Sequence, residues 1–161
     1  MSKILFLDRD GVINADRQDY TWKISDFIFL PGVFEACLHW QKAGFKIIVV
    51  TNQGGVAKGL YRHNDVNVLH NHMNDAFMSA GVNITDVYYC PHHPDSGLCL
   101  CRKPGSLLVE KALAVHNGNP EESWFIGDRE RDIVAANGAG VKGVLIPENG
   151  NLMTIYSNQV W

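Results

Sequence analysis

The sequence contains no apolar run that approaches the roughly 20 residues needed for a membrane-spanning helix. Its first residues lead directly into a strand-like segment, without the charged, apolar and small-residue regions of a secretory leader. Positive charge is also scarce, because 14 Lys and Arg residues face 17 Asp and Glu residues, for a net charge of −3. This balance argues against nucleic acid as the main partner. We therefore expect a cytoplasmic protein with no membrane partner.

Neither internal repeats nor low-complexity segments interrupt the 161 residues. A chain of this length can bury a substantial core, and 46% hydrophobic with 19% charged residues is ordinary for a soluble globular protein. We expect residues 1–161 to form a single domain. Nothing in the sequence marks an interface, so we predict a monomer whose partner is a small molecule.

Cysteine is sparse, with four residues in the whole chain. Three of them, Cys90, Cys99 and Cys101, lie within twelve residues of one another. In a reducing compartment such a cluster indicates metal binding or redox chemistry rather than a disulfide framework. Cys37 stands alone in a helical pattern and is expected to be a small core residue.

Short β-type runs alternate with helical patterns along the chain. Lys3–Leu7 and 46–50 are apolar runs typical of strands covered on both faces, and apolar residues at helical spacing follow each of them. This alternation predicts an α/β fold in which helices cover both faces of a parallel sheet. The other expected strands are 86–89, 123–126 and 143–146, and the expected helices are 33–40, 66–77, Leu107–Val115 and 133–139.

Polar side chains follow four of the expected strands. In a parallel sheet the carboxyl ends of the strands meet at one edge, and ligands bind just beyond that edge. The sequence therefore predicts a ligand site built from these residues. They are Asp8, Asp10, Thr51, Asn52, Cys90, His92, Gly127 and Asp128.

Asp8, Asp10 and Asp128 place three carboxylates at this edge. Like charges so close repel by a few kcal/mol at an intermediate dielectric constant, so we expect a neutralising cation, and oxygen ligands favour Mg²⁺. One carboxylate can attack a phosphoryl group to form an aspartyl phosphate. Another can protonate the leaving oxygen and then activate water. Thr51 can donate a hydrogen bond to the transferred phosphoryl group, and Lys103 can neutralise its charge.

Four segments, FLDRDGVIN, VVTNQ, CRKP and IGDRERD, stand in this order and resemble the four motifs of phosphatases of the haloacid dehalogenase-like (HAD-like) superfamily. The resemblance covers nearly the whole chain and implies a three-layer α/β/α Rossmann-like fold. It implies that Asp8 is the nucleophile and Asp10 the general acid and base, while Thr51 and Lys103 hold the phosphoryl group. Asp8, the backbone carbonyl of Asp10, and Asp128 would bind Mg²⁺.

The second aspartate, Asp10, favours phosphoryl transfer, because superfamily members that do not transfer phosphoryl groups generally lack it. Asp132 has two interpretations, as a support of the metal site or as a polar residue in the first turns of a helix. An inactive, zinc-stabilised binding protein is an alternative, but such members usually lose the nucleophile or the motif lysine. A phosphotransferase is another alternative, since the covalent intermediate can pass to an alcohol instead of water.

The segment CPHHPDSGLCLCRKP contains C-x-H and then C-x-C, with six residues between the two motifs. Three thiolates and one imidazole make a closed tetrahedral Zn²⁺ site, which suits a structural role. Free or redox-active thiols are the alternative. Either His92 or His93 can supply the imidazole, and the resemblance selects His92 together with the three cysteines Cys90, Cys99 and Cys101. Zinc would fix the adjacent Arg102 and Lys103 against the phosphate site before substrate arrives.

Only 42 residues separate Asp8 from Thr51, and 51 separate Thr51 from Lys103. These intervals leave no room for a cap domain, so a capless site closed by loops is expected. The candidate loops are 15–22, 53–63 and the segment with the cysteines. They carry polar residues suited to a small hydroxylated anion, namely Asp16, Asp19, Tyr20, Lys58 and Arg62.

Within the superfamily, the cysteine segment points to two related groups. TNQGGVAKG and CPHHP look closer to the D-glycero-D-manno-heptose 1,7-bisphosphate phosphatases of lipopolysaccharide biosynthesis. The short cysteine segment, and the lack of a Pro-Gly pair after CRKP, favour histidinol-phosphate phosphatases. We favour the heptose group. The substrate-binding residues that it implies are Asn52, Gln53, Gly54, Arg102 and Arg129, together with Asp16 and Tyr20.

Overall fold

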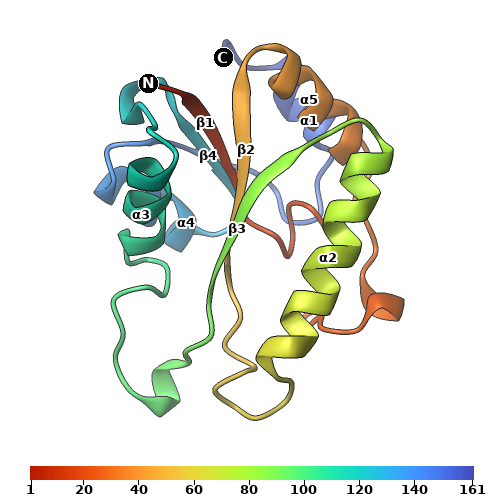
Figure 1. Cartoon of the computed structure of the whole chain (residues 1–161), viewed down its shortest axis with the longest axis vertical. Coiled ribbons are helices and arrows are strands. Elements are labelled where there is room, and N and C mark those ends of the chain that lie inside the picture. The colour runs from red at the N-terminus through yellow and green to blue at the C-terminus, as the bar shows by residue number, and fades with distance from the viewer.

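The computed structural model describes all 161 residues, and its centre is a parallel sheet of five strands in the order β3-β2-β1-β4-β5 (Figure 1). Parallel pairing joins every neighbouring pair of strands. The α/β prediction is confirmed. The strands are β1 (Lys3–Leu7), β2 (Phe45–Asn52), β3 (Ile84–Cys90), β4 (Trp124–Gly127) and β5 (Lys142–Leu145).

Helices cover both faces of the sheet and make three layers (Figure 1). Alternate residues of β1 point to opposite faces, so Leu5 and Leu7 join one core while Ile4 and Phe6 join the other. The first core contains α1 (Val33–Lys42), α2 (His63–Ser79) and α5 (Leu152–Ser157). The second contains α3 (Leu107–Val115) and α4 (Glu130–Gly138). The central strands β1 and β2 are largely apolar because both of their faces are covered.

Several elements extend beyond their predicted bounds. Strand β2 continues through Thr51 and Asn52, and Asn52 is still in register with Cys90 at the end of β3. Helix α4 begins at Glu130, three residues before the apolar pattern, because the Asp132 carboxylate accepts a hydrogen bond from the backbone N–H of Arg129 and caps its first turn. Polar residues at the ends of helices and strands do not belong to the apolar repeat, so a prediction from that repeat underestimates the lengths of these elements.

The C-terminal segment, which the sequence pattern does not place, forms the short helix α5 and ends on the apolar core. The ring of Trp161 lies 5.0 Å from Trp40 and 5.2 Å from Trp124, edge to face in both cases. Its indole N–H donates to the Tyr156 carbonyl at 2.9 Å. Such aromatic pairs stabilise beyond simple area burial, so the last residue contributes to the first core.

Loops, not a further domain, surround the carboxyl ends of the strands (Figure 1). A loop and one 3₁₀ turn, Ile24–Asp26, separate β1 from α1, and residues 53–62 connect β2 to α2. The segment from Cys90 to Lys103, called here the cysteine loop, connects β3 to α3 and contains the turn Pro94–Ser96. No helix has both the length and the apolar character required to cross a bilayer.

Candidate active site

Asp8 and Lys103 form a buried ion pair at the end of β1. The Lys103 ammonium lies 2.9 Å from Asp8 Oδ1 and 2.7 Å from Asp132 Oδ1, and it donates to the Val50 carbonyl at 2.8 Å. Only 1% of the lysine is exposed. The ammonium therefore stands between two carboxylates and a backbone carbonyl.

The charges around Asp8 oppose one another. The pKa of Asp8 is raised to about 7, because burial, together with the negative charges of Asp132 and Asp10, outweighs the lowering effect of Lys103. Burial also disfavours the charge of Lys103, but the two adjacent carboxylates outweigh that effect and raise its pKa. The lysine therefore stays charged, and Asp8 needs additional positive charge to ionise fully at neutral pH.

A second cation fits beside this pair. Carboxylate oxygens of Asp8, Asp128 and Asp132 all lie within 4.8 Å of one another. Both oxygens of Asp128 are buried without a hydrogen-bond partner, and burial with the nearby Asp132 charge raises the pKa of this carboxyl. Buried oxygens of this kind suit a hard divalent cation. Mg²⁺, held by Asp8 and Asp128, would supply the missing positive charge.

Two glycines make room for these carboxylates. A Cβ on Gly11 would lie 2.3 Å from Asp128 Oδ2, and the backbone there has φ +88°. A Cβ on Gly127 would lie 2.2 Å from the Cβ of Asp132. Asp132 itself is fully buried against Lys103. Both of its interpretations from the sequence therefore apply, because Oδ1 contacts Lys103 while Oδ2 caps the first turn of α4.

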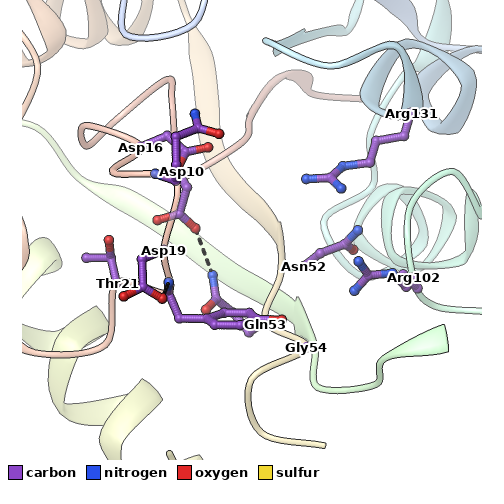
Figure 2. Close-up of a pocket in the computed structure, with 11 residues that line it drawn as sticks. Asp10, Asp16, Asp19, Thr21, Asn52, Gln53, Gly54, Arg102 and Arg131 are labelled. Carbon is purple, nitrogen blue, oxygen red and sulfur yellow. Dashed lines mark hydrogen bonds between the residues drawn. The ribbon is translucent and has the colours of Figure 1, made fainter. Parts of the chain in front are cut away.

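Asp10 receives hydrogen bonds from three side chains. Its Oδ1 accepts from Arg9 Nη2 at 3.1 Å and from Asn14 Nδ2 at 3.0 Å, while Oδ2 accepts from Gln53 Nε2 at 3.1 Å (Figure 2). Burial opposes ionisation, but the charge of Arg9 and these hydrogen bonds lower the pKa of Asp10. In the metal-free protein the two carboxylates therefore have pKa values shifted in opposite directions, raised for Asp8 and lowered for Asp10. A cation bound beside Asp8 would lower the pKa of that carboxyl and favour the ionised form that a nucleophile needs.

Thr51 and Asn52 hold the end of β2 against this centre. Thr51 is buried, and its hydroxyl oxygen accepts from Gln53 Nε2 at 2.9 Å. Asn52 donates to the Lys103 carbonyl at 3.1 Å and accepts from the Lys103 N–H at 3.0 Å. These two bonds fix the backbone of the motif lysine to the strand.

A polar pocket of about 370 Å³ opens beside Asp10 (Figure 2). Asp10 and Asp16 lie on one side of it, while Arg102 and Arg131 lie on the other side. Six of the seven residues predicted to bind substrate line this pocket, the exception being Arg129. The lining residues are Asp10, Asp16, Gln18, Asp19, Tyr20, Thr21, Asn52, Gln53, Gly54, Arg102 and Arg131.

Arg129 has three anionic partners, two of which come from other segments. Its guanidinium lies 3.0 Å from Glu148, 3.3 Å from Asp16 and 3.5 Å from Asp128. These contacts join the loop after β1 to the loop after β5. The predicted contact of Arg129 with substrate stays a prediction.

Arg131 lines the pocket, although no pattern in the sequence indicates it. It lies in the first turn of α4, two residues after Arg129. In the sequence it is one more charged residue of a polar segment. Only the orientation of α4 relative to the sheet brings it to the pocket.

The cysteine loop brings four metal-binding atoms together. Cys90 Sγ lies 3.2 Å from Cys101 Sγ, 3.7 Å from Cys99 Sγ and 3.4 Å from His92 Nδ1. All four cysteines of the chain are free thiols. Ligand separations of this size suit a tetrahedral Zn²⁺ ion bound through sulfur and nitrogen at about 2.0–2.3 Å. His93 instead accepts from the Asp95 N–H, so His92 is the ligand that fits.

The comparisons with known proteins agree with this geometry. A family model described as HAD-hydrolase-like matches residues 100–151. The D-glycero-β-D-manno-heptose-1,7-bisphosphate 7-phosphatase of Helicobacter pylori is 38% identical over 97% of this chain and 90% of its own length. The α-anomer phosphatase of Campylobacter jejuni is also 38% identical, over 92% of this chain and 83% of its own length.

Among solved structures, the D,D-heptose 1,7-bisphosphate phosphatase of B. bronchiseptica, complexed with magnesium and phosphate, superposes with a TM-score of 0.85. It is 31% identical, and the match covers 98% of this chain and 87% of that one. The fold, the buried aspartates and these matches together define a HAD-like hydrolase of the phosphatase class. Within that class, the chain belongs to the D-glycero-D-manno-heptose-1,7-bisphosphate 7-phosphatase family.

Proposed function

We propose that this protein removes the 7-phosphate of D-glycero-D-manno-heptose 1,7-bisphosphate by way of an aspartyl phosphate on Asp8. The observation that carries the proposal is the environment of Asp8. Its carboxylate is buried against Lys103 and lies near the oxygens of Asp128, which accept no hydrogen bond, directly after Leu7 ends β1. The family resemblance and the curated relatives, named as 7-phosphatases, support the substrate.

The side chains divide the chemistry among them. Asp8 Oδ1 accepts hydrogen bonds from Lys103 and from the Arg9 N–H, which leaves Oδ2 to attack phosphorus. Asp10 donates a proton to the departing C7 oxygen and later takes one from the attacking water. Thr51 and Lys103 hold the phosphoryl oxygens. Asp8, Asp128 and the Asp10 backbone carbonyl would hold Mg²⁺, which when bound would supply positive charge to the carboxylates and the phosphoryl group.

The pocket accommodates the remainder of a bisphosphate. Its two arginines, Arg102 and Arg131, form a cationic side that suits the second phosphate. Gly54 allows Arg102 to approach, because a Cβ there would lie 3.1 Å from Arg102 Nη1. Asp16 and Tyr20 face the region in which sugar hydroxyls would lie. Because Arg102 also donates to the His92 carbonyl at 3.1 Å, the zinc site would fix this cation in place.

The test compares phosphate release from both anomers of heptose 1,7-bisphosphate with release from histidinol phosphate, using one enzyme preparation with Mg²⁺. We expect much higher kcat/KM for a heptose bisphosphate, and its complete loss in Asp8→Asn. Higher kcat/KM for histidinol phosphate would overturn the substrate assignment. Phosphate release that persists in Asp8→Asn would overturn the nucleophile. No release from any of these phosphates would favour an inactive binding protein.

We propose further that the protein is a monomeric, single-domain enzyme of the cytoplasm, in which loops take the place of a cap. Thiols that must stay reduced to bind zinc suit that compartment. Sedimentation equilibrium measures the oligomeric state, and a mass above that of one chain would contradict the monomer. Fractionation of cells that express the protein tests its location.

A further inference from the structure

Arg9, which stands between the two motif aspartates, does not point into the pocket. Its side chain is 1% exposed and lies behind Asp10. The Nη2 group donates to Asp10 Oδ1 at 3.1 Å and to the Thr21 carbonyl at 2.7 Å. The other terminal nitrogen, Nη1, lies 3.1 Å from Nε2 of His70. The guanidinium therefore connects a residue of α2 to the side chain assigned as general acid and base.

The tautomer of His70 follows from this contact. A guanidinium can only donate hydrogen bonds, so Nε2 must be the acceptor and the ring proton must be on Nδ1. His70 is 6% exposed, and its ring lies edge-on to Tyr89 with centroids 5.8 Å apart. Burial and then the charge of Arg9 lower the pKa of His70 to about 3. The imidazole is therefore neutral and can accept from Arg9 at any pH at which the enzyme would work.

We infer that His70 is a positioning residue for the hydrolysis. It holds the Arg9 guanidinium in place, and Arg9 in turn holds the Asp10 carboxylate. His70 is not among the residues that line the substrate pocket. The inference rests on the proposed function of Asp10. It assigns a role in turnover to a helix residue on the far side of Arg9 from the pocket.

Loss of the His70 acceptor has a defined consequence. Arg9 Nε already lacks a hydrogen-bond partner, so removal of the imidazole would leave a second buried donor unsatisfied. A buried donor without a partner is costly, more so on a charged group, so we expect the guanidinium to shift toward other partners. Asp10 would then keep its bonds from Asn14 and Gln53 but lose the charged one. Displacements of about 1 Å at a reacting group are enough to reduce rates strongly.

The experiment uses the leaving group to separate this role from a structural one. A sugar alkoxide must be protonated as it departs, whereas p-nitrophenolate leaves without a proton. The value of kcat/KM depends only on the steps up to and including the first irreversible step, which is formation of the aspartyl phosphate. It therefore reports the protonation of the leaving group by Asp10 and not the later attack of water. The ratio of kcat/KM for the two phosphates, measured on one preparation, does not depend on the fraction of protein that is folded.

The variants are His70→Leu, His70→Gln and His72→Leu. His72 is the matched control, because it lies on the same helix and packs on the rings of Phe27 and Phe29 but makes no hydrogen bond to Arg9. We expect His70→Leu to lower kcat/KM for heptose bisphosphate by about tenfold, with a change within about twofold for p-nitrophenyl phosphate. His70→Gln places an amide oxygen where Nε2 was and should restore most of the loss. His72→Leu should leave the ratio of the two values unchanged.

The outcomes separate the inference from its premise. Asp10→Asn must itself lower kcat/KM more for the sugar phosphate than for the aryl phosphate, and its failure to do so would overturn the role of Asp10 and the inference with it. If Asp10→Asn behaves as expected but His70→Leu lowers both values equally, or changes neither, the positioning role alone is overturned. The same holds if His70→Gln is no better than His70→Leu.

Discussion

Replacement of Lys103 by methionine tests how the centre of the site is held together. The lysine lies between Asp8 and Asp132 at 2.9 Å and 2.7 Å, and none of these side chains is more than 6% exposed. Methionine fills a similar volume without charge. Lys103→Met therefore removes one cation and leaves two buried carboxylates without compensation.

The magnitude follows from burial. Removal of one partner from a buried ion pair costs about 3–5 kcal/mol, and here one cation serves two carboxylates. Domains of this size have total stabilities of roughly 5–15 kcal/mol, so we expect a large loss. Lys46→Met is the matched control, because the Lys46 ammonium donates only to the His116 carbonyl, at 3.1 Å. That change should cost about 1 kcal/mol.

The assay is urea unfolding, together with turnover in the presence of Mg²⁺. Lys103→Met should be destabilised by at least about 3 kcal/mol and be inactive. Asp132→Asn, added to Lys103→Met, removes one of the two uncompensated charges, so it should restore part of the stability but none of the turnover. If Lys103→Met costs no more than Lys46→Met, the charge arrangement deduced for this site is wrong.

Three further predictions concern the metals and the pocket. Removal of zinc under saturating Mg²⁺ should lower kcat/KM by about tenfold or more while the protein stays folded, because Arg102 loses its fixed position; full turnover without zinc would contradict this role. Arg131→Met should raise KM for a bisphosphate by about tenfold but leave KM for a monophosphate unchanged. The control is Lys42→Met, which removes an exposed charge at the opposite end of the sheet. Equal effects of the two changes on KM would exclude a second phosphate subsite at Arg131. The pKa of Asp8 rises from 3.8 to about 7 on folding. Between these two pH values the metal-free folded protein therefore binds more protons than the unfolded chain, and its stability falls as the pH rises. Mg²⁺ should therefore raise the melting temperature more at about pH 8 than at about pH 5, and an equal increase at both values would refute this linkage.

The sequence predicts the sheet and its catalytic edge because both depend on local patterns. Apolar runs such as Lys3–Leu7 identify strands, and the rule that parallel strands present their carboxyl ends together brings Asp8 near Asp128 without any knowledge of side-chain packing. The ligands in the cysteine loop are equally local. Their spacing indicates zinc, but it leaves the choice between His92 and His93 to the family resemblance.

Contacts that depend on how a helix is oriented cannot be predicted in this way. His70 is one of several histidines on a polar helix, and only the packing of α2 brings it to Arg9. Arg131 reaches the pocket while Arg129 pairs with Asp16 from a loop 113 residues away in the sequence. Trp161 has no periodic pattern around it, since α5 is only six residues long. These positions are set by tertiary packing.

The most direct test of the account is to find where phosphorus becomes attached. In Asp10→Asn, p-nitrophenyl phosphate can still phosphorylate the enzyme, because its leaving group needs no proton, but water is no longer activated to remove the phosphoryl group. Rapid acid quench followed by peptide mass spectrometry should then find a phosphoryl group on Asp8. Nitrophenolate release without any phosphorylated peptide, or with phosphate on another residue, would contradict covalent catalysis by Asp8.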